Sequence, residues 1–240
     1  MTRPLFVHQV EFEVAPGKLP EWRSYIPGYL SAQSRMPGSV SFRVLEDKGT
    51  PNRFFSMRTW LSKEDAMRAK ESPESQLAGQ PAKDCGFYDG MPVRHEEFEL
   101  LDMVWGLEGP TAFATQGLAA QHIVTGPGPG LYDLWRPYAR NFASVMARQP
   151  GLICHETYRS LADPERIVVL RTFRSTDAAN AGPEYAPPEE VKLAAKPAKD
   201  LGVYEGHVPA VRTECKLFDA VWGQAGQAAY DRFIMDLEPV

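Results

Sequence analysis

The first hundred residues alternate between two kinds of hydrophobic pattern. Residues 6–14, FVHQVEFEV, place apolar and polar side chains in turn, which is the two-residue period of a strand with one buried face. Residues 17–36 repeat apolar side chains at intervals of three and four, which predicts a helix despite the proline at position 27. Pro37-Gly38 then predicts the end of that helix.

The following segments predict a hairpin, a second helix and a closing strand. Residues 39–47 and 53–61 have the composition of strands, and the turn-forming KGTPN joins them. Ser62 is a preferred helix N-cap, and the acidic residues after it suit the first turn of a helix over 62–71. Residues 96–105 predict a last strand. The predicted order is therefore strand, helix, strand, strand, helix, strand.

The same pattern occurs twice along the chain. A shift of 113 residues superposes Pro37-Gly38 on Pro150-Gly151 and holds without a gap from residue 5 to residue 62. The motif PAKD recurs after 116 residues, and DxVWG recurs after 117. So many landmarks in one order indicate a tandem duplication, joined near residues 107–111. We therefore predict two domains, 1–108 and 112–240.

The duplication has a structural reason. A βαββαβ unit covers one face of its sheet with helices and leaves the other face bare, and two such units can bury their bare faces against each other. We therefore expect an α+β protein with two tandem ferredoxin-like halves, which together form an intrachain pseudo-dimeric α+β barrel.

Composition and charge indicate which kinds of partner and which cellular location to expect. The chain is 43% apolar, and it has no run of 18 apolar residues or signal-peptide pattern. Its three scattered cysteines predict neither a disulfide framework nor a zinc site, so we expect no metal. A net charge of −5 without basic clusters argues against nucleic acid. We expect a cytoplasmic protein with a small-molecule partner and no membrane partner, which could also form a homodimer.

Residues 36–74, MPGSVSFRVLEDKGTPNRFFSMRTWLSKEDAMRAKESPE, resemble the antibiotic biosynthesis monooxygenase type of dimeric α+β barrel. The features in common are Pro37-Gly38, the strand-ending Trp60, the helix cap Ser62 and Ser72-Pro73. The resemblance extends over 5–106 and, more weakly, over 118–223. Two-copy members include tailoring and ring-opening oxygenases of aromatic polyketides. The resemblance thus implies a monooxygenase that oxidises a polycyclic aromatic hydroquinone, phenol or anthrone with O2, either cofactor-free or with loosely bound reduced flavin.

Two other functions stay open at this point. Related proteins of the same fold bind or degrade haem, and others bind small molecules without catalysis, so fold alone does not decide. The sequence also departs from the family pattern. Ser56 and Val169 stand where members often carry an asparagine four residues before the strand tryptophan, and Lys70 stands where smaller members often carry histidine.

The chemistry of cofactor-free oxygenation selects the catalytic candidates. An aromatic substrate must lose a proton to a base, donors must stabilise its oxyanion, and apolar walls must exclude water. Histidine is the first choice of base. His155 replaces Phe42 of the first copy, and His8 shares the strand parity of its apolar neighbours. The predicted catalytic residues are His155, His8, Trp60 and Arg58.

The predicted substrate-binding residues lie on the same strands and on the first helix of each copy. Structural roles remain open for all candidates: a core histidine, a core tryptophan, or an arginine paired with a carboxylate. His95 and His207 are expected to be solvated, and Tyr88 and Tyr204 to order the loop before the last strand. The predicted substrate-binding residues are Trp22, Tyr25, Phe42, Trp135, Tyr138, Tyr158 and Arg171.

Overall fold

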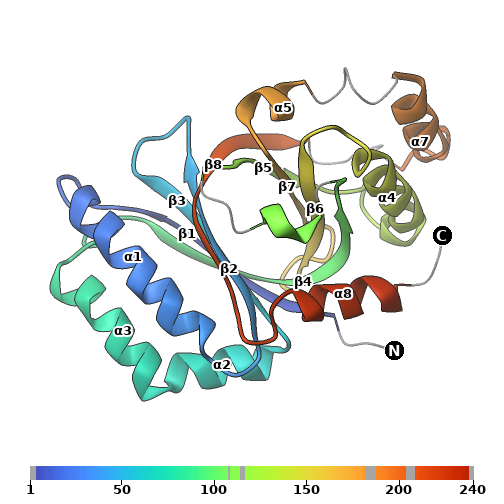
Figure 1. The fold of residues 1–240 in the computed structure, drawn as a ribbon. Helices are drawn as coiled ribbons and strands as arrows, with labels where there is room; N and C mark the ends of the chain where they lie inside the picture. Colours follow the sequence, from blue (N-terminus) through green and yellow to red (C-terminus); the bar gives the residue numbers. More distant parts are fainter. Residues whose placement is uncertain (1–3, 108, 114–116, 182–187, 204–208, 238–240) are drawn as a thin grey trace. The chain divides into compact units, whose positions relative to one another are not determined.

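A computed structural model describes residues 4–107, 109–113, 117–181, 188–203 and 209–237 of the chain. Tyr204 and His207 lie outside the described residues. The first half contains β1 (Phe6–Glu13), α1 (Leu19–Ser34), β2 (Ser39–Asp47), β3 (Arg53–Trp60), α2 (Lys63–Glu71), α3 (Pro73–Asp84) and β4 (Val93–Trp105) (Figure 1). The second half contains η1 (Pro110–Ala112), β5 (Ala119–Thr125), α4 (Tyr132–Met146), β6 (Leu152–Ser160), β7 (Ile167–Phe173), α5 (Thr176–Asn180), α7 (Pro188–Asp200), β8 (Val211–Trp222) and α8 (Gly226–Asp236).

The described strands follow one closed order of hydrogen-bonded neighbours, β1-β3-β2-β8-β5-β7-β6-β4, which is an antiparallel barrel. The predicted α+β barrel class is therefore confirmed. The second half repeats the strand register of the first. Arg58 pairs with His8 on one side and Phe42 on the other, and Arg171 likewise pairs with Gln121 and His155.

The chain divides into two compact units, and each of the long strands β4 and β8 contributes residues to both. The first unit comprises Met1–Glu99, Ala114–Gly117 and Cys215–Phe233, and the second comprises Leu100–Phe113, Leu118–Glu214 and Ile234–Val240. The boundary falls inside β4 and inside β8, because the last part of each strand pairs with the sheet that the other copy supplies.

The core of the first unit lies between its sheet and the helices α1, α2 and α3 (Figure 1). The even-numbered apolar residues of β1, β2 and β3 face these helices, as the two-residue period of a strand requires. Trp22, Ile26 and Leu30 project from α1 into the same layer, at the spacing of one helix face. Each large apolar side chain buried in this way contributes about 1.5–3 kcal/mol to the free energy of unfolding.

Helix α3 is an element that the sequence pattern did not predict. Ser72 ends α2 and caps α3, because its hydroxyl oxygen accepts a hydrogen bond from the Ser75 backbone N–H at 3.1 Å. Pro73 occupies the first position of α3, where its missing N–H costs nothing. Gln33 of α1 donates to the Ser75 hydroxyl at 2.7 Å, so α1 and α3 are held side by side. Helix α8, also not predicted, places the Tyr230 hydroxyl 2.7 Å from the Ser41 hydroxyl.

The glycine of the repeated VWG motif has the same role in both copies. A Cβ atom at Gly106 would lie 1.8 Å from the Leu152 carbonyl oxygen, and one at Gly223 would lie 2.4 Å from the Ser39 carbonyl. Both contacts are with backbone, which cannot move aside. The motif therefore recurs because each copy needs a strand to leave the sheet directly against a neighbouring main chain.

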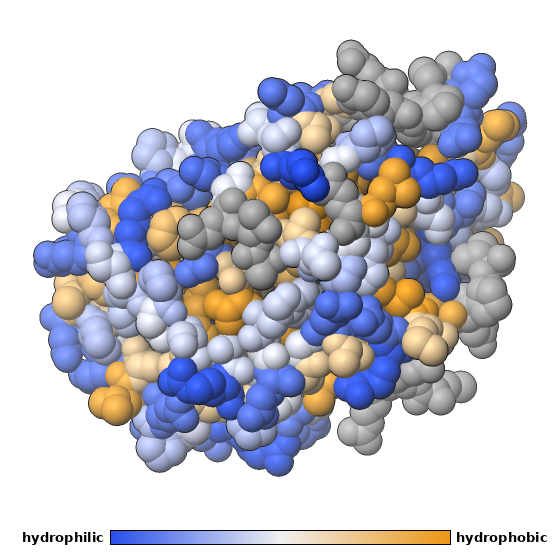
Figure 2. All heavy atoms as spheres, viewed as in Figure 1, coloured by the Kyte–Doolittle hydropathy of each residue, from blue (hydrophilic) through white to orange (hydrophobic). Residues whose placement is uncertain are grey.

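In the second unit, α4 packs against α7 and covers the apolar side chains of β5 and β7. On the face seen in Figure 2, hydrophilic side chains surround small groups of apolar ones. None of the helices in the described ranges is both long enough and apolar enough to span a bilayer.

Candidate functional site

A cavity lies in the first unit, with walls from the sheet, α1 and α3. Its volume is about 470 Å³, which is within the range of small-molecule sites. Its aromatic and ionisable walls come from Phe12, Tyr25, Tyr29, Tyr88, Arg58, Lys83, Asp89 and His95, with Ser56 among them. The remaining walls are Val10, Ile26, Leu30, Val44, Gly79, Ala82 and Val93.

Arg58 is a half-buried cation in the cavity wall without a carboxylate partner. Its Nε donates to the Ser56 hydroxyl at 3.2 Å, and its guanidinium lies over the Tyr29 ring, 5.5 Å from the ring centre. Within the described part of the chain, no carboxylate comes within ion-pair distance of it. A guanidinium in this setting attracts an anion strongly, because little water competes for it.

Tyr25 and Tyr88, two tyrosines of the cavity wall, differ in how their hydroxyls are hydrogen-bonded. Burial raises the pKa of both Tyr25 and Tyr88, so both hydroxyls keep their hydrogen at neutral pH. Tyr25 donates its hydrogen to the Ala78 carbonyl at 3.0 Å. The Tyr88 oxygen instead accepts from the Trp22 indole N–H at 3.1 Å, which leaves the Tyr88 hydrogen to be donated toward the cavity.

His8 and His95 form a stacked pair beside Arg58. Nε2 of His8 lies 3.2 Å from Nδ1 of His95, and the two ring centres are 5.3 Å apart with 13° between the ring planes. Desolvation, followed by the Arg58 charge, lowers the pKa of His8 from 6.5 to about 3. The same two causes lower the pKa of His95. Both rings are therefore neutral at pH 7, and a bound anion that offsets Arg58 would raise both pKa values.

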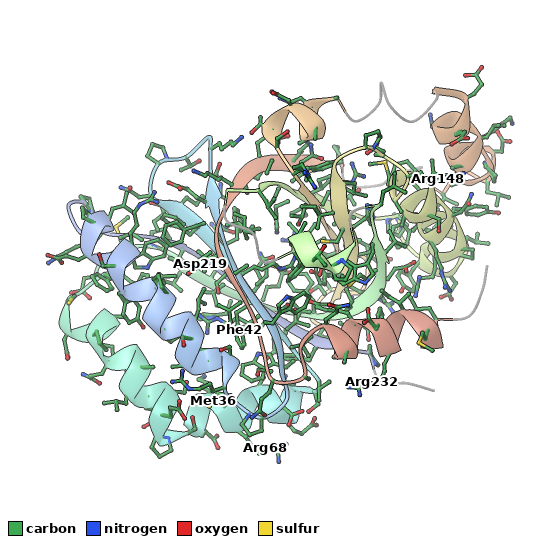
Figure 3. All side chains as sticks on the ribbon, viewed as in Figure 1. Met36, Phe42, Arg68, Arg148, Asp219 and Arg232 are labelled. Carbon is green, nitrogen blue, oxygen red and sulfur yellow. The ribbon has the colours of Figure 1, made fainter. Side chains whose placement is uncertain are left out.

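Three other predicted site residues of the first copy lie behind the cavity wall. Trp60 and Phe42, which is labelled in Figure 3, pack edge to face with ring centres 5.1 Å apart in the buried core. Trp22 is fully buried and contacts Phe12 and Phe54. Of the predicted residues, Arg58 and Tyr25 line the cavity directly, while Trp22 reaches it only through Tyr88.

The predicted residues of the second copy lie in the second unit, where Tyr138 and Arg171 are half-buried and the others are buried. His155 is 2% exposed, and its Nδ1 has no hydrogen-bond partner. Desolvation, followed by the charge of Arg171, lowers its pKa well below 6.5. Arg171 lies over the Phe142 ring. Trp135 and Tyr138 pack in the apolar cluster beneath α4, and Tyr158 is fully buried on β6.

Sequence reasoning missed three polar residues of the cavity wall. Tyr29 is not among the predicted residues, and Tyr88 was expected to order a loop. His95 was expected to be solvated and is exposed, but its place in the cavity wall was not predicted. One signal was present for two of them: Tyr29 corresponds to Phe142 in the second copy, and the segment VRHEE around His95 reads VRTEC there, without a histidine. A comparison of the copies at every aromatic and histidine position would have found both.

Comparisons with known proteins concern the family and the fold of the chain. Residues 5–80 match the model of the family described as antibiotic biosynthesis monooxygenase, and this range contains most of the cavity wall. A search of curated proteins finds no match. A structure of a proposed monooxygenase from Lactobacillus acidophilus NCFM has a TM-score of 0.73 at 8% identity, and covers 92% of this chain and 97% of its own.

Two further structures have the same extent. One is a proposed monooxygenase from Fusobacterium nucleatum subsp. nucleatum, with a TM-score of 0.72 at 11% identity, covering 92% of this chain and 96% of its own. Another is described as an anthrone oxidase-like protein, with a TM-score of 0.62 at 14% identity, covering 92% and 94%. At such low identity the likeness shows the fold alone, over 92% of this chain.

Proposed function

We propose that this protein is an oxygenase for a hydroxylated polycyclic aromatic compound, such as an anthrone or hydroquinone. The match of residues 5–80 to the antibiotic biosynthesis monooxygenase model supports an oxygenase. The observation that carries the proposal is Arg58, a cation without a carboxylate partner among the described residues, in the wall of an aromatic cavity. Such a cavity is suited to a flat ring system that carries a negatively charged oxygen.

The cavity would promote loss of the substrate proton by stabilising the anion. A phenol or enol ionises more readily beside a guanidinium, because the charged form gains an ion pair and hydrogen bonds in a region of low dielectric. The Tyr88 hydroxyl offers a second donor, and Tyr29 presents an aromatic face next to Arg58. The apolar walls exclude the water that would otherwise solvate the anion and weaken it as an electron donor.

The reaction balances without a further reductant. The substrate anion gives one electron to O2, and the resulting substrate radical and superoxide combine into a carbon-bound peroxide. Cleavage of the O–O bond, with loss of a hydrogen from the same carbon and transfer of a proton to the departing oxygen, gives the ketone and one water. One methylene group and one O2 thus yield one carbonyl and one H2O. We therefore propose a cofactor-free reaction, in which neither flavin nor haem is needed.

Oxygen uptake by the purified protein tests this proposal. We expect it to consume one O2 for each 1,8-dihydroxy-9-anthrone converted to the quinone, at a rate well above that of the buffer. A visible spectrum, recorded before and after addition of haem and of reduced flavin, shows whether the protein binds either cofactor. A haem band that saturates at one equivalent and accompanies turnover would replace the proposal with a haem enzyme, and binding of the anthrone without uptake would replace it with a binding protein.

We expect Tyr88→Phe to raise KM by a factor of about 10–100, because a hydrogen bond to a charged group is worth about 1.5–3 kcal/mol. The variant keeps the ring and loses only the donor, and the Trp22 indole N–H also loses its acceptor. Tyr25→Phe is the matched control, since the Tyr25 hydroxyl is already bonded to the Ala78 carbonyl. It should lower the unfolding temperature slightly and leave KM unchanged. Equal effects of the two variants on KM would contradict the claim that the Tyr88 hydroxyl, and not the Tyr25 hydroxyl, donates to the substrate.

A further inference from the structure

The stacked histidine pair gives the cavity a base, and its position indicates which ring takes the proton. We propose that His95 accepts the substrate proton at Nε2, and that His8 is a positioning residue that accepts the His95 Nδ1–H. This inference rests on the proposed function and deepens it, because it assigns the proton-transfer step to a named side chain. His95 lines the cavity, whereas His8 is reached through the 3.2 Å contact between Nε2 of His8 and Nδ1 of His95.

The exposure of the two rings supports this direction of transfer. His95 is an exposed residue at the start of β4, so a proton that it receives can pass to bulk water. His8 is half-buried on β1, next to Arg58 in the strand register. A ring that stays neutral there can serve as a hydrogen-bond acceptor when its own hydrogen is on Nδ1. A His95 with its hydrogen fixed on Nδ1 then presents the lone pair of Nε2 as the base.

The second copy supplies an internal comparison. Gln121 corresponds to His8, and the segment VRTEC (211–215), which corresponds to VRHEE (93–97), contains no histidine, so neither ring of the pair is repeated. Gln121 donates its side-chain N–H to the Ala179 carbonyl at 3.1 Å, in the interior of the second unit. The fold therefore does not require two histidines at these positions, and a role in the cavity of the first unit explains why both occur together.

The proton balance of the step is complete. The O–H bond of the enol tautomer, in which the methylene carbon has already lost one hydrogen to the oxygen, breaks; its electron pair stays on the oxygen beside Arg58, and the hydrogen forms a new bond with Nε2 of His95. The positive charge on His95 is stabilised through the Nδ1–H bond to His8. When the peroxide O–O bond breaks, the same hydrogen can return to the departing oxygen, which completes the water that the reaction releases.

Anaerobic mixing with 1,8-dihydroxy-9-anthrone tests the pair independently of oxygen chemistry, because the bound anion absorbs in the visible. We expect the wild type to form the anion, and His95→Ala to bind the neutral probe and to form the anion at least about tenfold more slowly. Added imidazole should restore much of this rate, since an exposed site lets it reach the cavity. His8→Leu should show the same loss, and His8→Gln should recover part of it, because a glutamine carbonyl can accept the His95 Nδ1–H.

The outcomes separate this inference from the proposed oxygenase. A His95→Ala protein that forms the anion at the wild-type rate would overturn the pair, as would a loss seen only in His8 variants, which would make His8 the base. A folded His95→Ala protein that imidazole fails to rescue would also overturn it. A wild type that forms the anion but consumes no oxygen would overturn the oxygenase and leave the base assignment standing.

Discussion

Arg58→Met should lower kcat/KM for the anthrone by a factor of about 10²–10³, the usual cost of removing one donor to a developing oxyanion. Methionine replaces the apolar stem of the arginine and removes the charge and all donors. Among the residues that the structure describes, Arg58 contacts the Ser56 hydroxyl and the Tyr29 ring and has no ion pair, so little of that structure depends on its charge. The loss should appear in both kcat and the affinity for the anion, measured by oxygen uptake and by anaerobic titration.

The duplicated chain offers a matched control for this variant. Arg171 occupies the same register position in the second copy, where it faces the buried His155 and the Phe142 ring. Arg171→Met should keep the wild-type rate, because none of the described cavities is lined by Arg171. Arg58→Lys should fall between wild type and Arg58→Met, since it keeps the charge and loses the planar fork. Equal losses in Arg58→Met and Arg171→Met would show that the cavity is not the reactive site.

Most of the fold could be predicted because the strands carry their own signal. The two-residue alternation of residues 6–14 indicates which side chains face the helices, although Val7 and Gln9 on the other face are buried as well. The repeat then gives the same alternation in the second copy. Helix α3 escaped prediction because its sequence, PESQLAGQPAKD, has a single large apolar residue, Leu77, which is 75% exposed. Its buried contact is made by the small Ala82, so no apolar period of a helix appears.

The cavity could be predicted only in part, because one of its walls belongs to α3, the helix without an apolar period. Strand parity placed His8 and Arg58 on the helix-facing side of the sheet, and the structure brings both to the same side chain, His95. The wall formed by Gly79, Ala82 and Lys83 depends on α3. Whether a space remains between helix and sheet is a matter of tertiary packing, which local pattern does not encode.

His155 shows how a contrast between the copies can have two physical causes. The replacement of Phe42 by histidine predicts a functional residue, and that assignment stays a prediction. Its location favours a second reading, in which a neutral histidine occupies a closed core at a cost in stability. Burial without a partner for Nδ1 means that the ring resists protonation in the folded chain and accepts it readily when unfolded.

His155→Phe should therefore make the protein more resistant to acid. Because the pKa of the folded state lies below the ordinary value of 6.5, the unfolded state binds more protons as pH falls. The stability tied to His155 is fully present above pH 6.5 and decreases below it by about 1.4 kcal/mol per pH unit, until the folded-state pKa is reached. The first copy carries a phenylalanine, Phe42, at the equivalent position, where it pairs with Arg58 as His155 pairs with Arg171. The substitution therefore fits the fold.

Urea unfolding of wild type and variant at several pH values between 7 and 5 measures this difference directly. The gain in unfolding free energy of His155→Phe should grow by about 1.4 kcal/mol for each pH unit below 6.5, whereas carboxylates affect both proteins equally and cancel. His8→Gln should give a smaller gain in unfolding free energy in the same pH window, since His8 is half-buried and solvent screens part of its pKa shift.

Oxygen uptake by His155→Phe then decides whether His155 is a catalytic residue or a core residue. A wild-type rate with the acid gain makes His155 a core residue, and a lost rate without the gain would restore its catalytic assignment.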